Sequence, residues 1–226
     1  MKTSPDVASL AALLTDPSRA AILMHLCDGR SWTAAELAKV AGIQAPAASA
    51  HLRKLLDGSL IRMTPSGRHR YFRLADNKVA QMLELFMRFS PEPPALTPGD
   101  RRAAANLRRC RLCYNHLAGQ IGVAITQRMV ELLWLVEAEP WYNLTPEGQR
   151  ALSGIGVESS EGRTCMDWSE RKLHIAGSLG TQVAHAFLSK KWLTRDNKSR
   201  ALLVTALGAE SLSKLLDCTN PELIGA

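Results

Sequence analysis

The sequence predicts a mainly α-helical protein with small β-hairpins, divided into two parts by a proline-rich segment. Apolar residues recur at helical spacing along much of the chain, and short runs of strand-forming residues flank turn signals. Four prolines and a glycine fall between Ser90 and Asp100. Because proline removes a backbone donor and interrupts a helix, we interpret residues 90–100 as a linker between a domain at 1–89 and another at 101–226.

Composition and charge limit the classes of function. The 226 residues are 46% hydrophobic and 22% charged, which is typical of a globular protein with room for two cores. The net charge of +7 favours an anionic partner, and residues 1–90 carry 12 Lys and Arg against 7 Asp and Glu. No apolar run reaches the roughly 20 residues of a membrane span, and the N-terminal stretch is too short for a signal peptide. We therefore expect a cytoplasmic protein with reduced cysteines and no membrane partner.

Capping and turn signals predict the elements of residues 1–89. Helices begin after capping residues and end at glycine, and strands flank a Pro-Ser-Gly turn. The expected order is a helix from Asp16-Pro17 to Asp28-Gly29, a helix from the capping box Thr33–Glu36 to Gly42, a helix over 45–57, strands at 61–64 and 71–74, and a helix after Asp76. This order is that of a winged helix-turn-helix.

Basic residues gather on the helix at 45–57 and on the hairpin that follows it. An α-helix fits the major groove of DNA, where its first residues reach base edges and nearby cations bind phosphates. A basic hairpin alone is more often a solvated turn, and His51 alone could be a packing residue, but here two adjacent elements carry the charge. We predict that double-stranded DNA is bound by Gln44, Ser49, His51, Arg53, Lys54, Arg68, His69 and Arg70.

Four motifs extend this interpretation: DPSRAAIL at 16–23, AELAKVAG at 35–42, Ser-Ala-His-Leu at 49–52 and GRHRYFRL at 67–74. With these motifs in order, residues 7–89 resemble the ArsR/SmtB family of bacterial winged-helix repressors. The resemblance implies a homodimer that represses from an operator and leaves it when an effector binds. It also implies that the first and last helices of this domain pair across a two-fold axis, through Leu10, Leu13, Leu14, Met82, Leu83 and Phe86.

Two departures from the family pattern matter. The DNA-reading helix usually begins with a polar run, whereas this chain has Gln-Ala-Pro-Ala at 44–47, which predicts more phosphate and shape recognition than direct base readout. The thiol, His and acid ligands of metal-sensing members are absent from the segments AELAKVA and DNKVAQMLELF. The resemblance therefore assigns no metal site to this chain.

Residues 101–226 contain an internal repeat, with copies at about 110–157 and 165–217. Six residues recur at an offset of 58, and Thr145 and Gly148 recur at 60 as Thr205 and Gly208. The six are His116, Ala118, Gly119, Gly122, Trp134 and Leu135, which recur as His174, Ala176, Gly177, Gly180, Trp192 and Leu193. We interpret each copy as a helix of about five turns, a hairpin beginning at the Trp and a second helix. This duplicated helix-hairpin-helix, itself winged-helix-like, would hold an effector between its copies.

Cysteine and histidine residues mark the candidate effector or redox site: Cys110, Cys113, His116, Cys165 and His174. On a helix Cys110, Cys113 and His116 would share one side, and with Cys165 they would form a thiolate-rich tetrahedral site for zinc or a softer ion. Alternatively, the neighbouring arginines would lower a thiol pKa and create a redox switch. The third possibility is simple packing. The offset of 58 favours packing, because it aligns the two helical cysteines with Trp168 and Arg171.

The sequence thus predicts a dimeric transcriptional repressor, released from its operator by a small molecule, metal or oxidant sensed in residues 101–226. No catalytic residues are predicted, because no phosphate-binding loop and no H-E-x-x-H motif occurs. The alternatives are a thiol-based redox or metal-binding enzyme or accessory protein, and a DNA-binding co-regulator that needs no ligand.

Overall fold

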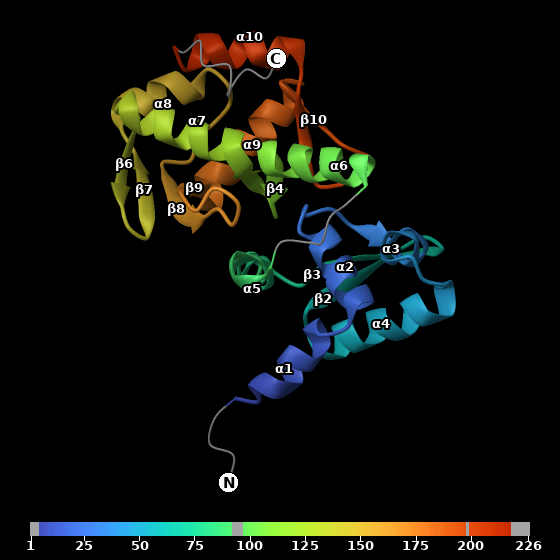
Figure 1. Cartoon of the computed structure of the whole chain (residues 1–226). Coiled ribbons are helices and arrows are strands. Elements are labelled where there is room, and N and C mark those ends of the chain that lie inside the picture. Colours follow the sequence, from blue (N-terminus) through green and yellow to red (C-terminus); the bar gives the residue numbers. More distant parts are fainter. Residues whose placement is uncertain (1–4, 92–96, 198, 218–226) are drawn as a thin grey trace. The chain divides into compact units, whose positions relative to one another are not determined.

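The computed structural model describes residues 5–91, 97–197 and 199–217 (Figure 1). The chain divides into two compact units, Met1–Leu85 and Phe86–Ala226, so the sequence boundary between them falls inside one helix. Helices dominate, as expected, but the described strands form four sheets, one of them four-stranded.

The first unit has the helix and strand order of a winged helix-turn-helix. Its elements are α1 (Val7–Leu14), α2 (Pro17–Leu26), β1 (Trp32–Thr33), α3 (Ala34–Ala41), α4 (Ala45–Asp57), β2 (Ile61–Ser66), β3 (His69–Leu74) and α5 (Asn77–Phe89), the last of which runs past the unit boundary. Fully buried side chains of α2, α3 and α4, such as Leu26, Leu37 and Leu55, form its core. The predicted elements are present, and β1 is an addition that pairs with β3.

Local side-chain chemistry explains where these helices begin and end. Asp16 accepts a hydrogen bond from the Arg19 backbone N–H, and Thr33 and Glu36 form the predicted capping box. Gly42 ends α3 at φ 65°, a left-handed conformation that favours glycine. The first unit is therefore specified mostly by contacts between residues close in sequence.

The second unit begins with α6 (Pro98–Arg109), and then the same order of hairpin, helix, hairpin and helix occurs twice. The first set is β4 (Arg111–Cys113), β5 (His116–Ala118), α7 (Gly119–Glu131), β6 (Leu135–Ala138), β7 (Trp141–Leu144) and α8 (Pro146–Ser153). The second is β8 (Glu161–Met166), β9 (Leu173–Ala176), α9 (Gly177–Ser189), β10 (Leu193–Arg195), β11 (Leu202–Val204) and α10 (Ala206–Leu215).

Two predictions for this unit are wrong. The five-turn helix is a hairpin followed by a 13-residue helix, so Cys110, Cys113 and His116 do not share a helical face. The linker predicted at 90–100 ends earlier, because Thr97 caps α6 and Pro98 occupies its first turn, where proline needs no amide partner. Residues 92–96 of that linker lie outside the described residues.

Equivalent residues adopt matching conformations in the two sets. Gly119 and Gly177 begin α7 and α9 at φ 79° and 70°, in the left-handed region. Thr145 and Thr205 each accept a hydrogen bond from the backbone N–H three residues later, and so begin α8 and α10. The 58-to-60-residue recurrence therefore corresponds to recurring backbone geometry.

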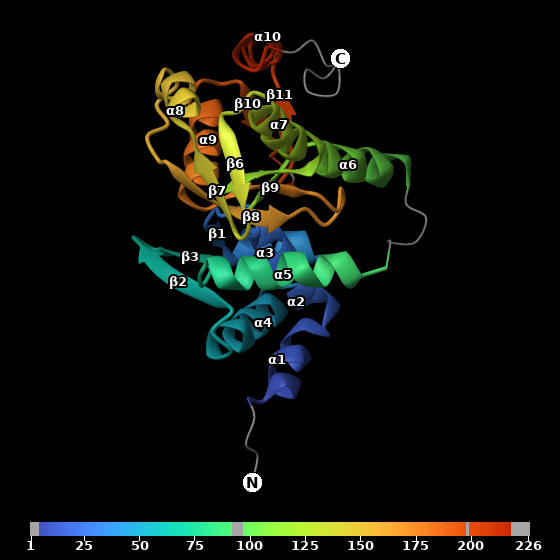
Figure 2. The ribbon, with the colours of Figure 1, turned by 90° about the vertical axis from the view of Figure 1, so that its left-hand side faces the viewer.

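A single antiparallel sheet joins the two sets, with β6, β7, β8 and β9 side by side (Figure 2). The apolar core draws on both sets, through residues such as Ile121, Tyr142, Leu179 and Phe187. The two sets thus share one core.

Among the described residues, no single helix is long and apolar enough to cross a membrane. The adjacent helices α1 and α2, bent by 87°, reach the necessary length and composition only as a pair.

Candidate nucleic-acid interface and metal centre

Helix α4 presents one face to the core and the other to solvent. Ala48, Leu52 and Leu55 are buried, whereas the predicted DNA contacts Gln44, Ser49, Arg53 and Lys54 are exposed. The Ser49 hydroxyl donates to the Ala45 carbonyl at 3.0 Å within the helix, and the Gln44 side chain makes no capping hydrogen bond. The exposed face is apolar at its start, over 45–47, and carries its basic residues, Arg53 and Lys54, further along the helix.

His51 differs from the other predicted contacts on α4. It is half-buried, and its Nδ1 lies 3.7 Å from a carboxylate oxygen of Asp16, which caps α2. This position favours the packing interpretation of His51, because its ring lies between two helices of its own unit.

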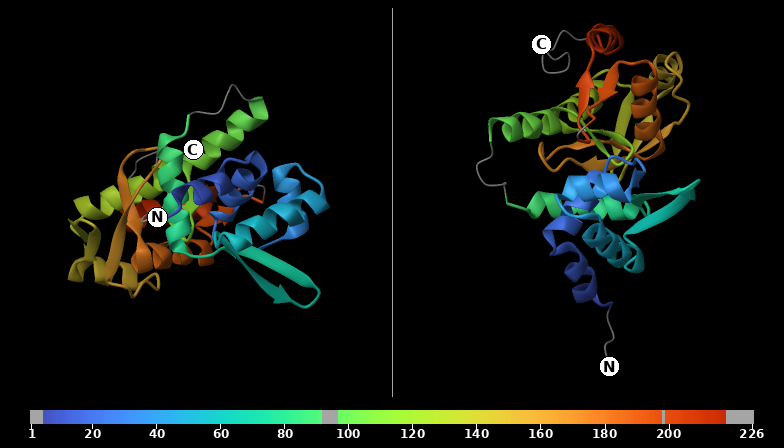
Figure 3. Two further views of the ribbon diagram at one scale, coloured as in Figure 1. Left: turned by 90° about the horizontal axis from the view of Figure 1, so that it is seen from below. Right: turned by 90° about the vertical axis from the view of Figure 1, so that its right-hand side faces the viewer.

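The β2–β3 hairpin carries the remaining predicted contacts. Arg68, His69 and Arg70 are exposed, as is Arg62 on β2. Gly67 turns the chain at φ 56°, and a Cβ there would meet no atom within 4 Å, so nothing crowds the tip. The hairpin extends beyond the helices of its unit (Figure 3), as the wing of a winged helix does.

The predicted dimer residues differ in exposure. Leu10, Leu13, Leu14 and Met82 are half-buried and Phe86 is 50% exposed, whereas Leu83 is 2% exposed and packs within the chain. Helix α1 is held by a residue the sequence interpretation missed: the Arg19 guanidinium donates to the carbonyls of Leu13 at 2.8 Å and Ala12 at 2.7 Å. The other large apolar side chains exposed on α1 and α5 are Val7, Leu85 and Phe89.

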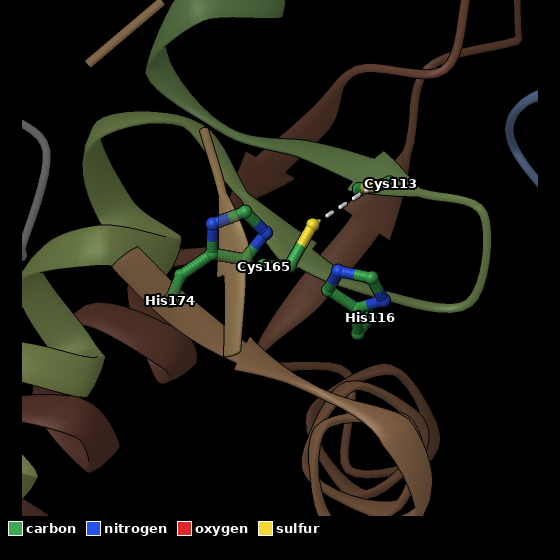
Figure 4. Close-up of side chains that lie close together, drawn as sticks. All are labelled: Cys113, His116, Cys165 and His174. Carbon is green, nitrogen blue, oxygen red and sulfur yellow. Dashed lines mark hydrogen bonds between the residues drawn. The ribbon is translucent and has the colours of Figure 1, made fainter. Parts of the chain in front are cut away.

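In the second unit, two cysteines and two histidines converge (Figure 4). Cys113 and His116 are directly opposite each other in the β4–β5 hairpin, and Cys165 and His174 are opposite each other in β8–β9. One potential ligand atom from each of the four lies within 4.8 Å of the others. The two sulfur atoms are 4.0 Å apart and the ring centroids 5.1 Å.

These four side chains are withdrawn from solvent. Cys113 and His116 are each 2% exposed and His174 is 0% exposed, while Cys165 is partly exposed. Three ring nitrogens have no hydrogen-bond partner among the described residues: both nitrogens of His174 and the Nε2 of His116. Burial, with the nearby His116, lowers the pKa of His174 to about 3, so its imidazole is neutral at pH 7.

Two interpretations of the cysteines need correction. Cys110 lies outside the cluster at the end of α6, in the apolar core, and burial raises the pKa of its thiol to about 12, outweighing the opposite effect of Arg111 and Arg109. The Cys–His pair is also duplicated after all. Because the second hairpin is longer, Cys113 corresponds in strand register to Cys165, not to Arg171. Pairing each His with the residue opposite it in its hairpin would have revealed the duplicated Cys–His pair. Aligning the two repeats at a constant offset of 58 residues could not.

Beside the cluster lies a buried ion pair that the sequence interpretation missed. Arg111, on β4, donates from Nη2 to both carboxylate oxygens of Asp167 at 2.9 Å, and both side chains are 0% exposed. The Gly119 backbone N–H at the start of α7 donates to the same carboxylate at 2.6 Å. Burial alone would raise the pKa of Asp167, but Arg111 and the backbone donors hold it well below its usual range.

Residues of both sets also line a surface pocket of about 570 Å³. Thr126, Glu137 and Tyr142 contribute from the first set, and Arg171 and Leu173 from the second. This open surface pocket lies between the two copies, and binding of a small molecule there stays a prediction.

Comparison with known proteins finds matches to the first unit. A helix-turn-helix domain model matches residues 14–64. Among solved structures, a homodimeric winged helix-turn-helix domain from Mycobacterium bovis, described as a possible ArsR-family regulator, is 28% identical over 38% of this chain and 86% of its own, with a TM-score of 0.34. The transcriptional repressor BigR from Xylella fastidiosa is 24% identical over 39% of this chain and 89% of its own, with a TM-score of 0.36.

A relative matches the whole chain. The HTH-type transcriptional regulator YdfF of Bacillus subtilis (strain 168) is 37% identical over 222 residues, 95% of this chain and 98% of the relative. The match includes the repeated second unit, so the two units occur together in both proteins. The chain therefore belongs to the family of helix-turn-helix transcriptional regulators, which bind DNA, that includes YdfF.

Proposed function

We propose that this regulator is a cytoplasmic, dimeric repressor of the ArsR/SmtB type, released from its operator by an effector that its second unit binds. The observation that carries the DNA-binding part is the joint exposure of basic side chains on α4 and on the wing of the same compact unit. In this proposal α4 enters the major groove, and the cations of the wing contact phosphates beside it.

Dimer formation is supported by apolar surface on α1 and α5. Val7 is 70% exposed, Phe86 50% and Phe89 79%, and α1 buries none of its residues within the chain. Several large exposed apolar side chains on these two helices are consistent with a protein interface. Pairing these helices across a two-fold axis would place two copies of α4 on successive major grooves, at about 34–36 Å spacing.

Effector binding in the second unit is supported by two sites that both repeats form together, the surface pocket and the Cys–His cluster. Neither arrangement requires a chemical reaction, because release from DNA needs only that the effector bind two states of the protein with different affinity. The proposal therefore includes no catalytic step.

The test begins with an operator selected from random DNA by the full-length protein. Substituting Arg68→Ala and Arg70→Ala together should weaken operator binding and reduce the slope of log K against log salt by about one to two, since each lost phosphate contact reduces counterion release by about one. The matched control is Arg150→Ala with Lys190→Ala, which removes two exposed cations from the second unit. An unchanged slope in the wing variant would exclude the wing from the interface.

A further inference from the structure

We propose that Cys113, His116, Cys165 and His174 bind one Zn²⁺ ion in a closed Cys₂His₂ site that links the two repeats of the second unit. The site is inferred from the geometry of this unit alone. Only its relevance to operator release rests on the proposed function.

The distances suit a tetrahedral ion. With Zn–S bonds of about 2.3 Å and Zn–N bonds of about 2.0–2.1 Å, neighbouring ligand atoms of a tetrahedral site lie about 3.3–3.8 Å apart. The sulfurs of Cys113 and Cys165 are 4.0 Å apart, and all four ligand atoms lie within 4.8 Å of one another. A contraction of at most about 1.5 Å, within reach of side-chain rotation, completes the coordination shell.

The two histidines carry ring nitrogens that have no hydrogen-bond partner among the described residues. A buried polar atom is normally hydrogen-bonded, yet His174 is fully buried and neither of its nitrogens has a partner among the described residues. The Nε2 of His116 is also buried and has no hydrogen-bond partner among the described residues, and both rings lie beside the two sulfur atoms (Figure 4). A metal ion satisfies all of these groups at once.

The donor set selects the class of ion. Two thiolates and two imidazoles favour zinc and other thiophilic ions over magnesium or calcium, which prefer oxygen ligands. Four protein ligands leave no open coordination position, which distinguishes a closed site from a catalytic one. Each hairpin supplies only one Cys and one His, so neither repeat can complete the site alone.

A disulfide between Cys113 and Cys165 is the competing use of these residues. It would require the sulfur atoms to approach from 4.0 Å to about 2.05 Å and would leave the His116 Nε2 and both ring nitrogens of His174 without partners among the described residues. The experiment must therefore separate metal ligation by four residues from oxidation of two.

The test uses Co²⁺ as a spectroscopic substitute for Zn²⁺ on the reduced, metal-free, full-length protein. We expect one Co²⁺ per chain, a thiolate-to-cobalt charge-transfer band, and the intense visible bands of tetrahedral cobalt, all lost when Zn²⁺ displaces it. Cys113→Ser with Cys165→Ser should abolish the charge-transfer band, and His116→Asn with His174→Asn should weaken cobalt binding at least tenfold. Cys110→Ala is the matched control, since Cys110 is equally buried but outside the cluster, and it should retain both signals.

A second measurement needs no substitution in the cluster, in case a variant fails to fold. Cys165 is partly exposed, so a thiol reagent should label it in the metal-free wild type, and Zn²⁺ should slow that labelling at least tenfold when followed by mass spectrometry. The proposal is overturned if wild-type protein shows no thiolate-to-cobalt band, if the double cysteine variant keeps it, or if Zn²⁺ leaves the labelling of Cys165 unchanged.

Operator binding is measured on the same preparations. Stoichiometric cobalt without DNA binding would overturn the proposed function and leave the zinc site standing. Operator binding by a chain that takes up no metal would overturn the zinc site alone.

Discussion

The buried pair of Arg111 and Asp167 gives the most specific stability prediction. Asp167→Asn removes the negative charge and leaves the Arg111 guanidinium uncompensated at 0% exposure. Breaking a buried ion pair by removing one partner costs about 3–5 kcal/mol. The carboxylate also accepts hydrogen bonds from the backbone N–H groups of Gly119, Ser169 and Glu170, so the upper part of that range is expected.

The effect should be confined to the second unit and large enough to measure by urea denaturation. For a domain of this size, 3–5 kcal/mol corresponds to a fall in Tm of about 6–20 °C. Four of the five tryptophans lie in this unit, at positions 134, 141, 168 and 192, so intrinsic fluorescence reports mainly on its unfolding. A chelator in every sample removes any contribution from bound metal.

A double-mutant cycle separates the ion pair from packing. Arg111→Met combined with Asp167→Asn removes both charges and keeps an amide oxygen that can accept from the backbone N–H groups, so the double variant should cost less than Asp167→Asn alone. A loss below about 1 kcal/mol for Asp167→Asn, or a double variant less stable than both single variants, would refute this account of the pair.

Three further predictions concern single positions. Gly208→Ala should destabilise the second unit by about 1–3 kcal/mol in the same assay, because a Cβ there would lie 1.9 Å from the Trp192 carbonyl oxygen. The control is Gly156→Gln: a Cβ at Gly156 would meet no atom within 4 Å, so this variant tests only the effect of the φ of 86°. Arg19→Ala should release α1 from the chain and raise the dimer dissociation constant measured by analytical ultracentrifugation, and an unchanged constant would argue against α1 pairing. Thr33→Ala should cost about 1 kcal/mol by Trp32 fluorescence. Hydrogen bonds from Thr33 lower the pKa of Glu36, so ionised Glu36 stabilises the fold above its unfolded pKa near 4.3, and this stabilisation is lost as the pH falls. The Thr33→Ala variant should therefore lose less stability on acidification than the wild type.

The first unit was predictable because its signals are local. The caps of α2 and α3 and the turn at Gly67 each involve residues within a few positions of one another, and the structure contains all of them. The short strand β1 was missed, because two residues, Trp32 and Thr33, carry no periodic pattern and are defined only by pairing with β3. The DNA contacts on α4 and the wing remain predictions, with His51 the weakest of them.

The second unit was less predictable for identifiable reasons. Strands β4 and β5 have three residues each, and their turn contains no glycine or proline: Tyr114 takes the left-handed conformation, at φ 62°. Without a turn signal, the spacing of Cys110, Cys113 and His116 fits a helix as well as a hairpin. Strands β7 and β8 pair although α8 lies between them in the chain, and the periodicity of the sequence does not predict which strands pair across such a connection.

The duplicated hairpins explain why the candidate metal centre was only partly recognised and how it arises. In each hairpin a Cys lies opposite a His, two residues before the alanine that precedes the following helix. Packing the two repeats against each other brings both pairs together, so two Cys–His pairs converge in the cluster that we propose binds zinc. The arginines two residues before each of these cysteines differ in their surroundings: Arg111 is buried against Asp167, whereas Arg163 is exposed and lies over the Trp141 ring at 4.9 Å. The two copies therefore have the same Cys and His at the cluster, whereas their equivalent arginines have different neighbours, which is the arrangement expected if the Cys–His cluster holds a shared ligand.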